Sequence, residues 1–215
     1  MMAGNASLAQ TQASPSKPDL QTSATTTGET QPERILIVGD SLSSEYGIRR
    51  QSGWVELLRL RLTEKSAQPA QVINASISGD TTSGGVSRLP ALLEQHRPTI
   101  VIIELGGNDA LRGLSMAMTR DNLTKMVELA QKSGAKPILA GMQIPPNYGP
   151  AYAESFKNVF PQVADQTQAA LIPFLLAGLE TDRSLFIEDG IHPSEQAQPK
   201  ILENVWEVLE PIIKS

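Results

Sequence analysis

Several features that decide a protein's class are missing from this chain of 215 residues. Cysteine is absent, which excludes disulfides, thiolate metal sites and a cysteine nucleophile. No apolar run reaches the about 18 residues that a membrane-spanning helix needs. The 18 basic residues are fewer than the 23 acidic ones and are scattered, whereas nucleic-acid binding needs a concentrated basic face. We therefore expect no integral membrane segment and no nucleic-acid partner.

The beginning of the chain has almost none of the large apolar side chains that a core requires. Residues 1–33 are rich in Ser, Thr, Gln and Ala, so we expect a disordered N-terminal tail or linker. This stretch has no apolar segment of the kind that a secretory signal needs. It is either native, for example what remains after a signal is removed, or a remnant of cloning. Residues 34–215 are enough for one domain with a real core.

The remaining chain alternates short apolar runs with segments of helical period. The runs are continuously apolar, which is typical of strands buried on both faces of a parallel sheet. The predicted strands are Ile35–Val38, Val72–Ala75, Ile100–Leu105, Pro137–Met142 and Ala170–Phe174. The predicted helices are Gly53–Lys65, Gly84–His96 (with Ser83 as N-cap), Thr119–Ser133, Pro150–Ala169 and Ser194–Ile213, the last interrupted near Pro199. This alternation predicts an α/β fold, a three-layer α/β/α sandwich.

Small, polar and glycine-rich segments follow the first four predicted strands. They read "GDSLSSEYG", "SISGDTTSGG", "GGNDALRGL" and "QIPPNYGP". The carboxyl ends of parallel strands share one edge of the sheet, where the connecting loops converge. We therefore expect the functional residues at that edge.

A serine and a histidine in these loops suggest nucleophilic catalysis. A serine hydroxyl is a weak nucleophile that needs an adjacent base, and the base needs a group to orient it. Ser41 follows the first strand directly, and the chain has two histidines.

His96 ends a predicted helix, where it can bond terminal carbonyls. His192 follows Asp189 in the short turn "DGIHP", so that the carboxylate can reach the imidazole. We predict a triad of Ser41, His192 and Asp189; simple turns or caps at these positions are the competing interpretation.

Acyl transfer also requires donors for the oxyanion of the tetrahedral intermediate. The candidates are the backbone N–H groups of Ser41 and Gly79 and the side-chain amide of Asn108, although each position taken alone also suits a tight turn. A magnesium site made by Asp40, Asp80 and Asp109 is a further alternative. Each of these aspartates lies beside a predicted catalytic or oxyanion residue, which favours hydrogen bonds that brace the loops, and we predict no metal.

The motifs "GDSLS", "NASISGDTT", "ELGGNDALRG" and "DGIHP", in this order, resemble the four blocks of the SGNH (GDSL) hydrolase family. The Ser, Gly, Asn and His of that name match Ser41, Gly79, Asn108 and His192, with Asp189 as the acid. Over nearly all of residues 34–213 the sequence is most similar to the bacterial thioesterase I / lysophospholipase L1 / arylesterase group. The resemblance implies a flavodoxin-like, five-stranded parallel sheet of order 2-1-3-4-5 and neither a metal nor a cofactor.

The same resemblance implies a function. We expect a serine esterase and thioesterase that hydrolyses aryl esters, lysophospholipids and acyl-CoA through an acyl-enzyme intermediate on Ser41. The resemblance also implies a monomer that is periplasmic or secreted; no signal is visible, and a cytoplasmic location is the alternative. Two other functions stay open, a carbohydrate or short-chain ester deacetylase of the same superfamily and a non-catalytic module that holds FMN or a phosphate in these loops.

The acyl chain needs an apolar, water-poor surface. The loops after the third and fourth strands offer apolar side chains for it, with ordinary loop packing as the competing role. The predicted acyl pocket consists of Leu111, Leu114, Ile144, Pro145 and Tyr148.

Overall fold

The computed structural model describes residues 1, 4, 32–65 and 69–214. Most of the predicted tail of residues 1–33 lies outside the described residues, and its disorder stays a prediction. The chain from Pro32 onward forms a compact unit. Within the described residues, no helix is both long and apolar enough to cross a lipid bilayer.

Five strands form one parallel sheet in the order β2-β1-β3-β4-β5, which confirms the predicted order. The strands are β1 (Arg34–Gly39), β2 (Gln71–Asn74), β3 (Ile100–Glu104), β4 (Lys136–Ala140) and β5 (Ala170–Ile172). Strand β1 lies between β2 and β3 and pairs with β2 from Arg34 and with β3 from Ile35, so that all three run in parallel toward the same edge. Because the sheet is parallel, each strand is followed by a crossover segment that covers one of its faces.

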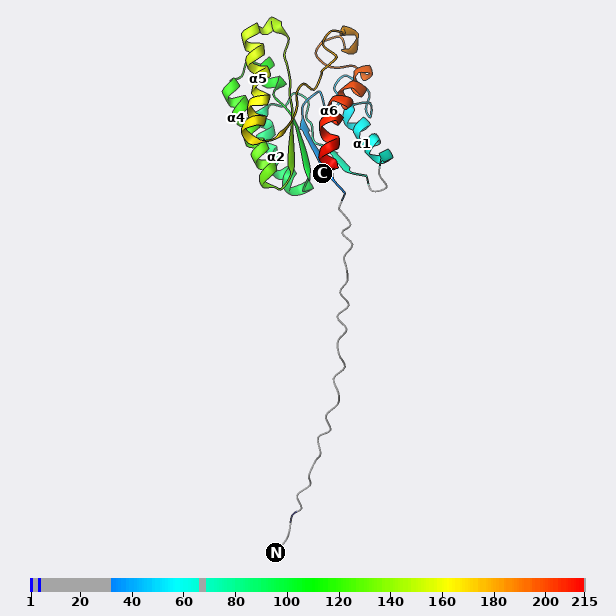
Figure 1. Cartoon of the computed structure of the whole chain (residues 1–215), viewed down its shortest axis with the longest axis vertical. Helices are drawn as coiled ribbons and strands as arrows, with labels where there is room; N and C mark the ends of the chain where they lie inside the picture. Colours follow the sequence, from blue (N-terminus) through cyan, green and yellow to red (C-terminus); the bar gives the residue numbers. More distant parts are fainter. Residues whose placement is uncertain (2–3, 5–31, 66–68, 215) are drawn as a thin grey trace. The chain divides into compact units, whose positions relative to one another are not determined.

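Helices cover both faces of the sheet, as Figure 1 shows for α2, α4 and α5 on one side and α1 and α6 on the other. The helices are α1 (Trp54–Lys65), α2 (Thr82–His96), α3 (Gly107–Leu111), α4 (Met116–Lys132), α5 (Pro150–Thr167) and α6 (Gln198–Ile213). Short 3₁₀ helices lie at η1 (Pro146–Tyr148), η2 (Arg183–Leu185) and η3 (Glu195–Ala197). This arrangement is the predicted three-layer sandwich.

Successive residues of β1 show why its sequence is apolar throughout. Leu36 and Val38 are buried in the core on the side of α2, α4 and α5, whereas Ile35 and Ile37 are buried in the core on the side of α1 and α6. Side chains alternate between the two faces of a strand, so a strand covered on both faces needs apolar residues at every position. Truncation of one such side chain to Ala typically costs about 2–5 kcal/mol. The core therefore fixes the sheet edge from which the site is built.

Two local predictions were wrong in detail, and one short helix was missed. Helix α2 begins at Thr82, and the cap is Thr81, whose side chain accepts a hydrogen bond from the Gly84 N–H, rather than Ser83. The short helix α3 was not predicted, because its five residues are too few to show a helical period. Pro199 does not interrupt a helix but stands in the first turn of α6, where its missing N–H has no intrahelical partner to lose.

Candidate active site

The nucleophile candidate Ser41 lies two residues beyond β1, in a loop that opens at the carboxyl edge of the sheet. The loop folds back on itself, since the N–H groups of Ser43 and Ser44 both donate to the Asp40 carbonyl. Ser41 is half-buried and lines a cavity together with His192 and Asn108. The buried strand therefore holds the serine in place while its hydroxyl stays accessible.

The turn that carries His192 is held by antiparallel backbone pairing. The Ile187 N–H donates to the His192 carbonyl at 2.9 Å, and a β-bridge joins Phe186 to Pro193. Gly190 at the tip of the turn has a φ of 67°, in the left-handed region that favours glycine. The sequence "EDGIHP" thus forms a tight, braced loop that presents the imidazole at a fixed place.

Asp189 performs two tasks in this turn. Its Oδ1 accepts hydrogen bonds from the backbone N–H groups of Ile191 and His192, at 2.8 and 3.0 Å. Its Oδ2 lies 2.7 Å from His192 Nδ1. Burial alone raises the pKa of the Asp189 carboxyl, but the backbone donors of His192 and Ile191 and the His192 side chain outweigh burial and lower the pKa below its ordinary value. The carboxylate form is therefore stabilised beside the imidazole.

The structure brings the three predicted triad residues into one chain of hydrogen bonds. His192 Nε2 lies 2.8 Å from the Ser41 hydroxyl, across 151 positions of sequence. Since Asp189 occupies Nδ1, the Nδ1–H tautomer leaves Nε2 free to accept the serine proton. The side chain of His192 is only 19% exposed, so water competes weakly for these bonds. The arrangement can activate a hydroxyl for attack on a carbonyl.

Tyr46 is a neighbour of the triad that the sequence did not reveal. Its ring lies 4.5 Å from the His192 ring, centroid to centroid, at an interplanar angle of 45°. The loop after β1 carries it, and its side chain is otherwise exposed to solvent. A tyrosine five residues after the serine gives no pattern from which this contact could be predicted.

Two of the predicted oxyanion donors are backbone N–H groups, those of Ser41 and Gly79. The N–H groups of Ser41 and Gly79 have no acceptor among the residues that the structure describes. Gly79 has a φ of 80°, and its carbonyl accepts a hydrogen bond from the Arg112 side chain at 2.8 Å. Arg112 directly follows α3, which carries Asn108. Gly79 is thereby linked to the element that holds the third donor, although Gly79 itself does not line the cavity.

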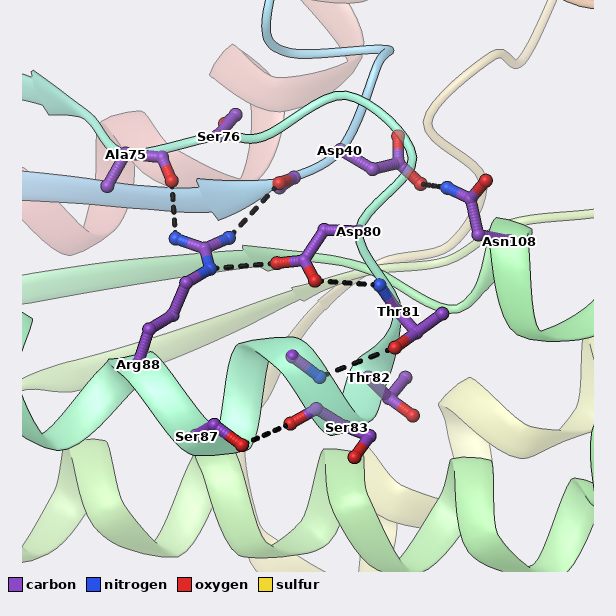
Figure 2. A network of polar contacts seen from close by, with 12 residues as sticks. Asp40, Ala75, Ser76, Asp80, Thr81, Thr82, Ser83, Ser87, Arg88 and Asn108 are labelled. Atoms are coloured by element: carbon purple, nitrogen blue, oxygen red, sulfur yellow. Dashed lines mark hydrogen bonds and ion pairs between the residues drawn. The ribbon is translucent and has the colours of Figure 1, made fainter.

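The side-chain amide of Asn108 is oriented by Asp40. Its Nδ2 donates to Asp40 Oδ2 at 2.9 Å, a contact that Figure 2 shows. The other carboxylate oxygen, Asp40 Oδ1, accepts from the Leu42 N–H at 3.1 Å. The NH₂ group has two hydrogens, so one stays free to donate while the first fixes which end of the amide is nitrogen. Asp40 thus fixes the orientation of the Asn108 amide.

Behind Asp40 lies a second carboxyl group that is fully buried. Glu104 ends β3, and its Oε2 accepts hydrogen bonds from the Asp40 N–H at 3.1 Å and from the Ser43 hydroxyl at 2.6 Å. Gly39 leaves room for it, because a Cβ there would come within 2.5 Å of that oxygen.

Burial raises the pKa of Glu104 well above its ordinary value, and the charge of Asp40 raises it further. Burial also raises the pKa of Asp40, against the hydrogen bonds from Leu42 and Asn108. Burial and the charge of Asp40 therefore both favour the neutral form of Glu104.

The cavity next to Ser41 has a volume of about 530 Å³. Of the predicted acyl-pocket residues, Leu111, Ile144 and Pro145 line it. Leu114 and Tyr148 do not line it, and their side chains are exposed at 41% and 44%. The wall also contains apolar residues that the prediction missed: Leu42, Met142, Phe174, Leu175, Leu176, Phe186 and Ile191. Most of them come from the loops after β1, β4 and β5, whose approach to one another is set by the fold and not by any local motif.

The residues of the two alternative sites, His96 as the base and three aspartates as magnesium ligands, lie elsewhere or make other contacts in the structure. His96 ends α2 just before β3 begins, at the opposite edge of the sheet from Ser41. Asp109 accepts hydrogen bonds from the Thr82 N–H and hydroxyl, and Asp80 pairs with Arg88. Among the described residues, no group of three or more His, Cys, Asp or Glu side chains is arranged to hold a metal ion. The three aspartates considered for magnesium brace three different contacts instead.

Comparison with known proteins gives a consistent result for the family. The model of the GDSL-like lipase/acylhydrolase family matches residues 37–198. Esterase TesA of Pseudomonas aeruginosa is 48% identical over 187 residues, which cover 87% of this chain and 92% of that protein. The arylesterase of Vibrio mimicus is 44% identical over 82% of this chain and 88% of its own length. The thioesterase 1/protease 1/lysophospholipase L1 of Escherichia coli K12 is 38% identical over 84% of this chain and 85% of its own length.

Solved structures show the same fold. The crystal structure of TesA superposes with a TM-score of 0.81 at 49% sequence identity, covering 83% of this chain and 99% of that one. The psychrotrophic esterase EstA from Pseudoalteromonas sp., solved in a form inhibited by monoethylphosphonate, superposes with a TM-score of 0.78 at 40% identity, over 85% of this chain and 100% of that one.

Proposed function

This chain belongs to the GDSL-like lipase/acylhydrolase family, and on that premise we propose that it is an esterase and thioesterase whose nucleophile is Ser41. The observation that carries the proposal is the hydrogen-bond chain from Ser41 through His192 to Asp189. Similar proteins bear the names esterase, arylesterase, thioesterase and lysophospholipase, so ester and thioester bonds define the substrate class.

The reaction begins with proton transfer from Ser41 to His192. As the proton moves to Nε2, the serine Oγ attacks the carbonyl carbon of the ester or thioester, and Asp189 stabilises the imidazolium that forms. The N–H groups of Ser41 and Gly79 and the amide of Asn108 bind the oxyanion of the tetrahedral intermediate. Collapse expels the alcohol or thiol, which takes the proton from His192, and leaves an acyl group on Ser41. Water activated by the same imidazole then releases the carboxylic acid.

The cavity beside Ser41 is proposed to hold the acyl chain. Ligand sites of this size are typically lined by apolar groups with a few polar groups that fix orientation. Here Ser41, Asn108 and His192 are the polar groups of the proposed reaction site, and most of the other lining residues are aliphatic or aromatic. The wall also contains the polar side chains of Asp40, Gln143, Glu180, Thr181 and Arg183. A medium or long acyl chain therefore has more surface to bury than an acetyl group, which favours acyl hydrolysis over the deacetylase alternative.

Kinetics on a series of esters test this function. We expect hydrolysis of p-nitrophenyl esters and of acyl-CoA, with kcat/KM rising from the two-carbon acyl chain to longer chains and turnover abolished in Ser41→Ala. A preference for acetyl esters of sugars over all longer acyl chains would favour the deacetylase. Equal rates for acyl chains of two to sixteen carbons would contradict the assignment of the cavity.

The proposed location is the periplasm or the exterior of the cell, and the proposed state is a monomer; both follow from the resemblance to the thioesterase I group. Fractionation of cells that express the full-length gene, with light scattering on the purified protein, tests both. Activity that is confined to the cytoplasmic fraction would contradict the location.

A further inference from the structure

The loop that carries Gly79 connects the end of β2 to the N-cap of α2 and has no regular secondary structure. Its backbone is attached to β1 by two hydrogen bonds, from Ala75 N to the Ile37 carbonyl at 2.9 Å and from Ile77 N to the Gly39 carbonyl at 3.0 Å. Beyond Ile77 the backbone makes a turn, in which Asp80 N donates to the Ile77 carbonyl, and Gly79 lies within that turn. The position of Gly79 therefore depends on the contacts of Asp80 as well as on the hydrogen bond from Arg112 to the Gly79 carbonyl.

One side chain binds this loop to the strand that carries the nucleophile. Arg88 extends from α2, and its Nε donates to Asp80 Oδ2 at 2.8 Å. Its two terminal nitrogens donate to the carbonyls of Ala75 and Gly39. Figure 2 shows the guanidinium between the end of β1, the segment after β2 and the Asp80 side chain. A guanidinium presents its donors in a rigid planar fork, whereas an ammonium group is a compact charge whose three donors rotate freely.

The ion pair between Arg88 and Asp80 is largely shielded from solvent. The exposed fractions of the two side chains are 19% and 12%. The second carboxylate oxygen, Asp80 Oδ1, accepts a hydrogen bond from the Thr81 N–H at 2.9 Å. Asp80 is thus held on both oxygens, one by α2's arginine and one by the backbone that leads into α2. Neither residue lines the cavity, so neither is placed to contact a substrate there.

We propose that Arg88 is a positioning residue for the reaction: by binding the Gly39 and Ala75 carbonyls and the Asp80 carboxylate at once, it fixes the Gly79 N–H relative to Ser41. This inference rests on the proposed function, because it takes the Gly79 N–H as an oxyanion donor. A donor that is already aimed before the oxyanion forms needs no reorganisation during the reaction. A shift of about 1 Å in a reacting or stabilising group can lower the rate about 100-fold.

The first test replaces the guanidinium. We expect Arg88→Gln to lower kcat for a short-chain p-nitrophenyl ester about 10- to 100-fold, less than the about 10²- to 10³-fold loss typical when a donor is removed outright. KM should change less than about three-fold, since no substrate contact is lost. Arg88→Lys keeps the charge but not the three-way geometry, and we expect it to lie between the parent and Arg88→Gln.

A second variant moves Asp80 without touching Arg88. Gly84 lies in the first turn of α2, and a Cβ at this position would overlap with the Asp80 carboxylate. Gly→Ala usually stabilises a helix. Gly84→Ala is nevertheless expected to lower kcat about 10-fold by displacing Asp80. If Arg88→Gln does not fold, Gly84→Ala decides the question.

The matched control is Arg61→Gln. Arg61 pairs with Glu203 between α1 and α6, on the other side of the sheet, and its side chain is 24% exposed, close to the value for Arg88. The kcat of Arg61→Gln should stay within two-fold of the value for the parent protein. Titration of active sites with a fluorophosphonate corrects every kcat for the fraction of protein that is competent, which removes the effect of partial unfolding.

The outcomes separate this inference from the proposed function. Reduced kcat per labelled site with nearly unchanged KM in the folded variants at Arg88 and Gly84 supports the positioning role. Values within about three-fold of the parent overturn it and leave the proposed function intact, provided that the parent hydrolyses the ester and Ser41→Ala does not. A parent protein that neither hydrolyses the ester nor reacts at Ser41 overturns both.

Discussion

Asp189→Asn isolates the role of the acid in the proposed triad. In the parent, Asp189 Oδ1 accepts from two backbone N–H groups and Oδ2 faces His192 Nδ1 at 2.7 Å. An asparagine keeps the turn only if its amide oxygen stays on the two backbone donors, which places its NH₂ against Nδ1. Nδ1 must then be the acceptor, and the proton moves to Nε2, opposite Ser41. This tautomer cannot accept the serine proton.

The expected loss is about 10⁴-fold in kcat, the size of the effect when the acid of a serine-protease triad is replaced in this way, which corresponds to about 5 kcal/mol in the activation barrier. KM should be little changed, because Asp189 does not line the cavity. Stability should also be little changed, because both turn hydrogen bonds remain. Asp189→Ala is the comparison: it removes the acceptor of both N–H groups, and each lost hydrogen bond costs about 0.5–1.5 kcal/mol of unfolding free energy.

Steady-state kinetics on a p-nitrophenyl ester and urea unfolding measure the two effects separately. Asp189→Asn that retains more than a tenth of the parent kcat, with an unchanged fold, would mean that another group orients His192.

Three further changes probe the donors, the buried carboxyl pair and the cavity. Asn108→Ala removes one oxyanion donor and should lower kcat about 10²- to 10³-fold; a loss below three-fold would remove Asn108 from the site. The pKa of Glu104 is raised in the folded chain, so folding takes up a proton above the unfolded pKa of about 4.3 and the stability that Glu104 contributes falls as pH rises. Glu104→Gln cannot titrate, and its unfolding free energy relative to the parent should increase from pH 5 to pH 8; an equal difference at both pH values would refute the protonated state. Ile144→Trp fills part of the cavity and should lower kcat/KM for twelve-carbon esters at least 10-fold more than for acetyl esters; a uniform loss would place the acyl chain elsewhere.

The sequence was sufficient to predict the sheet, and its short motifs singled out the three residues of the proposed triad, which the structure brings into hydrogen-bonding contact. Continuous apolar runs such as that of β1 occur where a strand is covered on both faces, and strand order followed from the family resemblance. Ser41 and His192 could be proposed as partners because Ser41 lies directly after the first predicted strand and because the chain has only two histidines, of which His192 follows an aspartate in a short turn.

The parts that were missed depend on tertiary contacts between loops. Glu104 ends a strand that is otherwise apolar. This single ionisable residue was the only feature of the strand's sequence that indicated a buried polar site. The reach of Arg88 across two strands, and the contact of Tyr46 with His192, depend on side-chain directions that no sequence pattern encodes. Leu114 and Tyr148 were apolar and in the expected loops, but the path of those loops leaves them exposed.

The central claim is that the Ser41 hydroxyl is activated by His192, and reaction with a fluorophosphonate followed by peptide mapping tests it most directly. The account predicts one label per chain, on the peptide that contains Ser41, in the parent protein, and a labelling rate at least 100-fold lower in folded His192→Ala. A label on any other residue, or labelling of Ser41 at the parent rate without His192, would contradict it.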